Sequence, residues 1–98
     1  MKIPKKLRLF GFDWKVILGE KIEGANFDWK IKTIKISTKY KEQEKLFLHE
    51  LMEDMLTEMH FRFYGQEKNM EYRFEMTHTE FCNFVNAFYQ ALKDNKLF

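Results

Sequence analysis

The sequence predicts an α+β fold in which a small N-terminal antiparallel sheet packs on two helices, as one domain over residues 1–98. Three observations support this prediction. Apolar and polar residues alternate through the first part of the chain, an i, i+3, i+4 apolar stripe follows over about 41–60, and a second stripe begins after Thr77. The 98 residues include 45% hydrophobic and 33% charged residues, a composition typical of a folded domain.

The first strands are predicted from a two-residue period. Leucines alternate with charged residues over 7–9, Gly11 permits a turn, and apolar residues alternate again over 12–18, which together indicate a hairpin. Phe27 and Trp29 keep the same period, but its phase breaks before Ile34. Because a register slip would expose one of the two apolar sets, we expect a turn there, and three or four antiparallel strands in all.

The break in phase is best explained by a turn across residues 30–32. From about Lys41 to His60 the period changes to that of a helix. The expected buried stripe of this helix is Leu48, Leu51, Met52, Met55, Leu56 and Met59. The segment 61–76 then alternates again at Tyr72, Phe74 and Met76, and residues 65–69 supply turn chemistry, so a second short hairpin is expected.

The last helix has a clear predicted start, because Thr77 and Glu80 form a T-x-x-E capping box. The expected buried face consists of Phe81, Phe84, Val85, Phe88 and Leu92. His78 lies three residues before Phe81, so we expect it to project toward the core or the other helix.

Composition narrows the function classes. The single cysteine, Cys82, excludes an intrachain disulfide and favours a reducing cytoplasm. No segment has the length of a membrane span, and Arg8, Asp13 and Lys15 interrupt any signal-peptide core, so we expect a cytoplasmic protein that does not enter membranes. The net charge of +2 predicts no specific nucleic-acid partner, although the basic start "MKIPKKLRLF" makes nucleic-acid binding the third hypothesis.

The stretch "FLHELMEDM" contains the residues of a candidate metal site. His49 and Glu53 are four residues apart, so their Cβ atoms lie about 5–6 Å apart on one helix face and the side chains can share a metal ion. Glu50 lies about a quarter of a turn away, so it can reach a metal-bound water without binding the metal. The zinc motif H-E-x-x-H works in this way, and here glutamate replaces its second histidine. The competing interpretation is that His49 flanks the stripe and both glutamates are solvated helix formers.

A catalytic zinc needs a third protein ligand. His60 lies seven residues beyond Glu53, roughly 10 Å along the helix, which is too far for one ion. Cys82 can face the same way as His78, but a lone cysteine in a helix stripe is usually a small buried hydrophobe. Glu80 is used by the cap, so His78 is the expected third ligand.

The sequence resembles the small phage and prophage proteins described as zincin-like, minimal relatives of the ImmA/IrrE-type metallopeptidases. The matching stretches are "MKIPKKLRL", "FDWKIKTIKIS", "LFLHELMEDML" and "NAFYQALKDN". Many members resemble H-E-x-x-E at the helix and carry a histidine ten residues before an aromatic pair, where this chain has His78. The resemblance implies a minimal zincin-like fold, one zinc ion held by His49, Glu53 and His78, and Glu50 as the catalytic base.

Two functions follow as hypotheses. The resemblance implies a phage-encoded zinc metallopeptidase that hydrolyses a peptide or amide bond in the cytoplasm of the infected or lysogenic bacterial host. Tyr72, Arg73 or Tyr89 would stabilise the oxyanion, and an exposed strand edge would align an extended substrate. The alternative is a non-catalytic phage protein, an inhibitor or adaptor that binds a host protein and has a structural metal or none. The sequence does not determine the oligomeric state.

Overall fold

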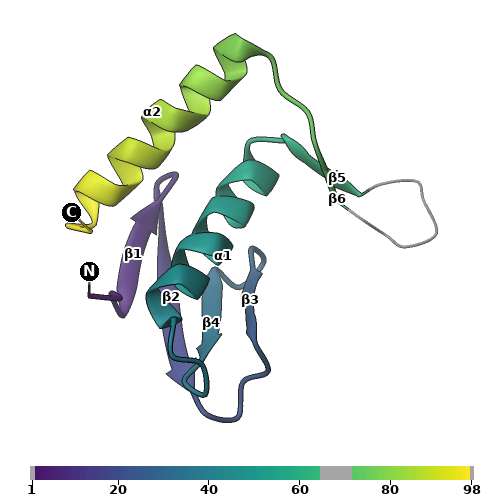
Figure 1. The fold of residues 1–98 in the computed structure, drawn as a ribbon. Helices are drawn as coiled ribbons and strands as arrows, with labels where there is room; N and C mark the ends of the chain where they lie inside the picture. Colours follow the sequence, from purple (N-terminus) through teal and green to yellow (C-terminus); the bar gives the residue numbers. More distant parts are fainter. Residues whose placement is uncertain (1, 65–71, 98) are drawn as a thin grey trace.

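The computed structural model describes residues 2–64 and 72–97, with the strands of the second hairpin described by their backbone alone. Figure 1 shows a sheet with one helix lying across its face and a second helix running past the first strand. The elements are β1 Lys6–Leu9, β2 Phe12–Gly19, β3 Ala25–Asp28, β4 Thr33–Ser37, α1 Gln43–Glu58, β5 Arg62–Tyr64, β6 Tyr72–Phe74 and α2 His78–Asp94. The predicted α+β class is confirmed.

The four-stranded sheet is mixed, so the prediction of an all-antiparallel sheet is wrong. The strand order is β1-β2-β4-β3, with β2 and β4 parallel and the other two pairs antiparallel. Burial explains this order, because four of the five residues of β4 are buried whereas β3 is only partly covered. The more apolar strand takes the central position, and the chain crosses over it to place β3 at the edge.

Both predicted turns of this sheet are confirmed. Phe10 and Gly11 join β1 to β2, and both have positive φ, at 51° and 82°. A two-residue turn of this kind matches the twist of a hairpin, and the second position suits glycine because it has no Cβ. Residues 29–32 turn between β3 and β4, where Asp28 Oδ1 accepts a hydrogen bond from the Lys30 N–H at 2.9 Å.

The buried face of α1 differs from the expected stripe. The helix packs on β3 and β4, and its buried residues are Phe47, Glu50, Leu51, Asp54 and Met55. Met52, which we expected inside, is exposed. The sheet contacts the helix face centred on Phe47, Leu51 and Met55. The buried face therefore includes Glu50 and Asp54 and excludes Met52.

The second hairpin is confirmed as an antiparallel pair, β5 with β6. The expected turn at residues 65–69 lies outside the described residues. No helix in the described part of the chain is long and apolar enough to cross a membrane.

The predicted start of α2 is confirmed. The Thr77 hydroxyl accepts from the Glu80 N–H at 3.2 Å, and the Glu80 carboxylate accepts from the Thr77 N–H at 2.8 Å. At the other end, Asn95 joins α2 to β1: its Oδ1 accepts from the Arg8 N–H at 2.7 Å, and its Nδ2 donates to the Arg8 carbonyl at 2.9 Å. The helix is thus held to the sheet mainly near its C-terminus.

The expected buried face of α2 is only partly correct. Phe84 and Ala91 are buried and Phe88 packs against the core, but Phe81 and Val85 are exposed. Figure 1 shows the reason: the first turns of α2 lie beyond the C-terminal end of α1 and do not reach the sheet. The N-terminal half of α2 therefore has little of the domain to pack against.

Candidate metal centre on α1

Helix α1 brings two of the predicted ligands together. His49 and Glu53 lie one turn apart, and His49 Nε2 contacts Glu53 Oε1 directly. The histidine side chain is 62% exposed and the glutamate 22%, so the pair lies at the boundary between α1 and solvent. This geometry supplies two metal ligands from one helix face.

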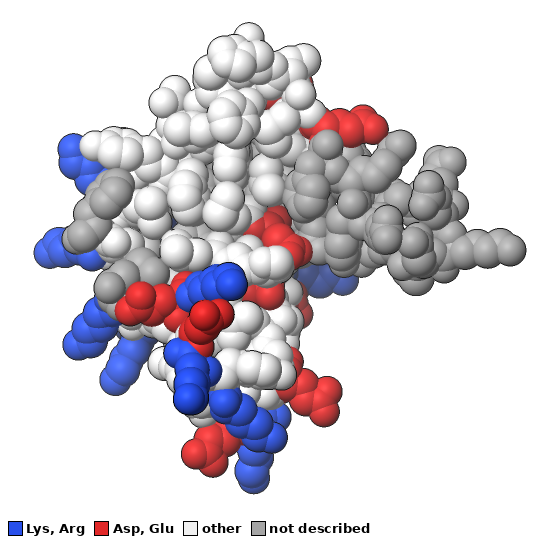
Figure 2. Space-filling model, in the orientation of Figure 1, with Lys and Arg blue, Asp and Glu red and all other residues white. Residues whose placement is uncertain are grey.

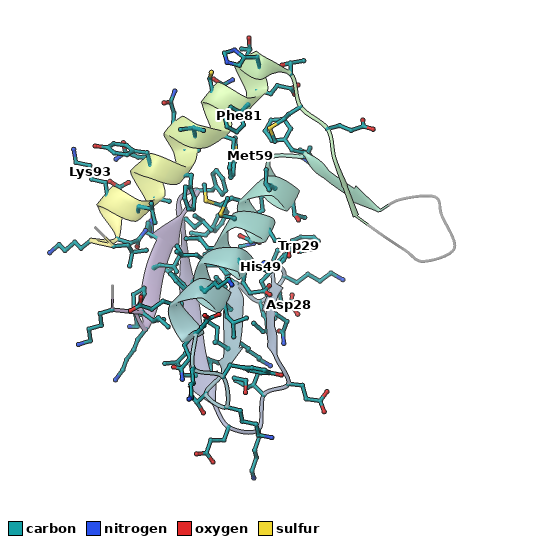
Figure 3. The ribbon with its side chains drawn as sticks, viewed as in Figure 1. Asp28, Trp29, His49, Met59, Phe81 and Lys93 are labelled. Atoms are coloured by element: carbon teal, nitrogen blue, oxygen red, sulfur yellow. The ribbon has the colours of Figure 1, made fainter. Side chains whose placement is uncertain are left out.

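Glu50 points away from solvent. The residue is only 8% exposed, on the side of α1 that packs against the sheet. Figure 3 shows His49 beside the middle of α1, well below the C-terminal end of that helix. The two neighbouring residues therefore face different environments, as their one-residue separation on a helix requires.

His78 does not face the core, which corrects the prediction from its spacing to Phe81. It is the first residue of α2 and is exposed, because that turn projects beyond the rest of the domain. Its neighbour is Cys82, whose Sγ lies 3.9 Å from each ring nitrogen of His78. Cys82 is exposed as well, so it is not the buried hydrophobe that its position in the stripe favours.

The structure thus contains two separate pairs of metal-ligating side chains, His49 with Glu53 on α1 and His78 with Cys82 on α2. Within residues 2–64 and 72–97, no three His, Cys, Asp or Glu side chains come close enough to hold one ion. A catalytic zinc requires three protein ligands. The arrangement described does not fit such a centre, although each pair can contribute to one.

Other predicted site residues lie elsewhere. His60 follows the end of α1 with φ of 64° and is exposed. The side chains of Tyr72 and Arg73 lie outside the described residues. Tyr89 is on α2, with Lys93 Nζ 5.8 Å from its ring centroid.

The structure adds a residue that the sequence argument missed, Asp54. Its side chain is fully buried, and burial followed by the neighbouring Glu58 carboxyl raises its pKa from the ordinary 3.8 to about 9, with Lys32 acting in the opposite direction. Among the described residues no hydrogen-bond donor reaches either oxygen of Asp54. A pKa of about 9 keeps Asp54 protonated at pH 7, so the group is neutral there and its own proton is available for a hydrogen bond with Glu58.

Lys32 places a positive charge near this acidic pair. Its ammonium donates to the Trp29 carbonyl at 2.6 Å and lies 5.0 Å from the Phe12 ring centroid and 5.8 Å from that of Trp14. Aromatic faces stabilise a cation, so these rings and the Trp29 carbonyl hold the Lys32 ammonium in place. The sequence did contain a signal for Asp54, because it follows Phe47 by seven residues and Leu51 by three.

Comparisons of the chain with protein-family models, with curated proteins and with solved structures return no match. The functional argument therefore depends on the residues themselves.

Proposed function

We propose that the protein is a non-catalytic binding protein, an adaptor or inhibitor, that uses α2 to contact another protein in the cytoplasm of a bacterial host. The observation that supports this is a stripe of three exposed apolar side chains at four-residue intervals. Phe81 is 49% exposed, Val85 45% and Tyr89 49%. We call these three residues the α2 stripe.

The α2 stripe lies on a stretch of helix without charged residues, with Glu80 before it and Lys93, whose Nζ is 5.8 Å from the Tyr89 ring centroid, after it. No Lys, Arg, Asp or Glu occurs between Glu80 and Lys93. Figure 2 shows the same feature in space, because the upper part of the molecule, where α2 lies, is an almost uncharged surface. Large apolar residues gathered on an uncharged surface are typical of protein interaction sites.

The α2 stripe lies beside the buried face of the helix. Helix α2 packs through Phe84 and Ala91, which are buried, and through Asn95 at its end. About half of each stripe side chain is exposed, so the stripe can extend the apolar face of α2 toward a partner.

The chemistry of the partner follows from length and charge. Phe81 and Tyr89 are separated by eight residues, about 12 Å of helix, which matches two turns of an apposed helix. Apolar anchors at helical spacing are how amphipathic helices bind one another. With Glu80 at one end and Lys93 at the other, the expected occupant is an amphipathic helix with a basic residue near Glu80 and an acidic one near Lys93.

The test places a charge in the centre of the α2 stripe. Val85→Glu introduces a carboxylate where the partner must be apolar, whereas Asn86→Glu adds the same charge to the next exposed residue, off the stripe. A photo-reactive amino acid in place of Val85 would identify the host protein in cells, and titration with that purified protein would give the affinity. We expect Val85→Glu to weaken binding by at least about tenfold and Asn86→Glu by less than about twofold.

Two results would contradict this proposal. Equal binding by both variants would show that the α2 stripe is not the contact. Light scattering that shows a dimer lost only in Val85→Glu would assign the stripe to a second copy of this chain instead.

A zinc-dependent peptidase is the second candidate, because His49 contacts Glu53 on a partly exposed helix face beside Glu50. When bound, zinc would activate a water for peptide hydrolysis, and Glu50 would carry its proton. This candidate requires a third ligand that the described arrangement does not bring to His49 and Glu53. It predicts one zinc per tag-free chain, lost in His49→Ala and in His78→Ala. No bound zinc in the parent protein at neutral pH would eliminate it.

A further inference from the structure

The pair formed by His78 and Cys82 lies at the N-terminal end of α2. Both residues are exposed, and the Cys82 Sγ lies 3.9 Å from each ring nitrogen of His78. On a tetrahedral zinc ion, a thiolate at about 2.3 Å and an imidazole at about 2.0 Å have donor atoms about 3.5 Å apart. The pair therefore needs little rearrangement to bind one zinc ion through both side chains.

The helix holds these two side chains in place. Residues four apart share one face of a helix, and the capping box of Thr77 and Glu80 fixes the first turn, which carries His78. The last side-chain torsion of histidine is broad, so the exposed ring can aim one nitrogen at a metal bound by Cys82. Two donors on one ordered turn bind a metal at a smaller entropy cost than two donors on a flexible segment.

The pair supplies only half of a closed zinc site. Structural zinc ions have four protein ligands, and two cysteines with two histidines are one of the common sets. Among residues 2–64 and 72–97, no three metal-ligating side chains come together. Figure 1 shows that the start of α2 lies beyond the C-terminal end of α1. A closed site at this position therefore needs two ligands from another molecule.

A second copy of this chain can supply the missing ligands. A two-fold axis through the metal brings in the same histidine and cysteine from the partner, which completes the set of four. The neighbouring surface permits this approach, because Phe81 and Val85 are exposed and no charged residue occurs from Phe81 to Leu92. The Glu80 carboxylate is engaged in the capping box of its own helix. Apolar contacts can thus form beside the metal without repulsion between like charges.

We propose that His78 and Cys82 form half of a zinc site, and that two copies of the chain complete it as a tetrahedral centre between the starts of their α2 helices. Each thiol releases its proton when it binds the zinc ion. The site uses neither His49 nor Glu53. It goes beyond the proposed binding to a host protein, because the zinc bridge forms without that protein.

The zinc bridge also affects the α2 stripe. Positions 78, 82 and 85 are four and three residues apart, so the zinc ligands lie on the same side of α2 as Val85. The second copy would cover part of the stripe, and zinc should therefore compete with the host protein. This consequence alone rests on the proposed function.

The test measures the zinc content and the mass in solution of tag-free, reduced protein, by metal analysis and light scattering, with zinc and with a chelator. We expect a monomer with the chelator and, with zinc, a dimer that holds one zinc ion per two chains. Cys82→Ser and His78→Ala should each abolish the dimer. The control is His60→Ala, which removes another exposed histidine and should leave the dimer unchanged. With Co²⁺ in place of zinc, the visible absorption of a tetrahedral thiolate site should appear in the parent and be lost in Cys82→Ser.

Several results would overturn the proposal. Protein that binds no zinc at neutral pH, or that stays monomeric when loaded, would exclude the bridge. One zinc per chain that is lost in His49→Ala and retained in Cys82→Ser would assign the metal to α1 instead. A dimer that forms without zinc and only under oxidising conditions would show a disulfide between two chains. Equal binding of the host protein with zinc and with chelator would overturn the competition and not the bridge.

Discussion

The two helices of this protein use their apolar residues in opposite ways. Helix α1 buries two carboxyl groups, Glu50 and Asp54, in the face that packs on the sheet, and it exposes Met52. Helix α2 leaves Phe81 and Val85 exposed, and no charged residue occurs from Phe81 to Leu92. The comparison shows that an apolar stripe does not by itself identify the buried side of a helix, because the surface available for packing determines it.

The largest expected difference between the helices is in the cost of removing a phenylalanine. Phe47 of α1 is completely buried, whereas Phe81 of α2 is 49% exposed. Phe47→Ala should lower the free energy of unfolding by about 3–5 kcal/mol, because it leaves a cavity in the core. Phe81→Ala should lower it by less than about 1 kcal/mol. Urea denaturation followed by circular dichroism measures both, and similar losses would show that the start of α2 is packed in solution.

Most of the fold could be predicted from the sequence because its signals are local. The turn at Gly11, the break before Ile34 and the capping box at Thr77 each depend on neighbouring residues, and the structure confirms all three. The parallel pairing of β2 with β4 could not be predicted, because alternation shows which side of a strand is buried but not which strand lies beside it.

The candidate site could be predicted only in part, for the same reason. The contact between His49 and Glu53 follows from their spacing on one helix. The position of His78 depends on how α2 is placed against α1, and no local pattern contains that information. Asp54 was missed because a carboxyl group in an apolar stripe is ordinarily assigned to solvent.

The second prediction concerns the buried carboxyl group of α1. Since the pKa of Asp54 is raised from 3.8 to about 9, the folded state keeps a proton that the unfolded state releases. The stabilisation of the folded state by protonated Asp54 is fully present below pH 3.8. The free energy of unfolding should therefore fall as the pH rises from 3.8 toward 9. Asp54→Asn is neutral at every pH, so it should remove this slope, and its stability relative to the parent should increase from pH 5 to pH 8.

The control for Asp54 is Asp13→Asn, which changes an exposed carboxylate paired with Arg8 at 2.8 Å. It should alter stability by less than about 1 kcal/mol and leave the pH dependence unchanged. Urea melts at pH 5 and pH 8 give both quantities. Parent protein that is equally stable at the two pH values would show that Asp54 is not protonated in the folded state.

The smallest expected effects concern the two helix starts. Here α2, and not α1, has the stabilising interaction. Helix α2 begins with a complete capping box, but the N-cap residue of α1, Glu42, makes no capping bond. Thr77→Ala should therefore cost about 1 kcal/mol, whereas Glu42→Asp should add about 0.5 kcal/mol, because the shorter carboxylate can reach the first N–H groups of α1. Chemical denaturation of both variants measures this contrast. Equal stability of Glu42→Asp and the parent would show that a side-chain cap adds nothing at the start of α1.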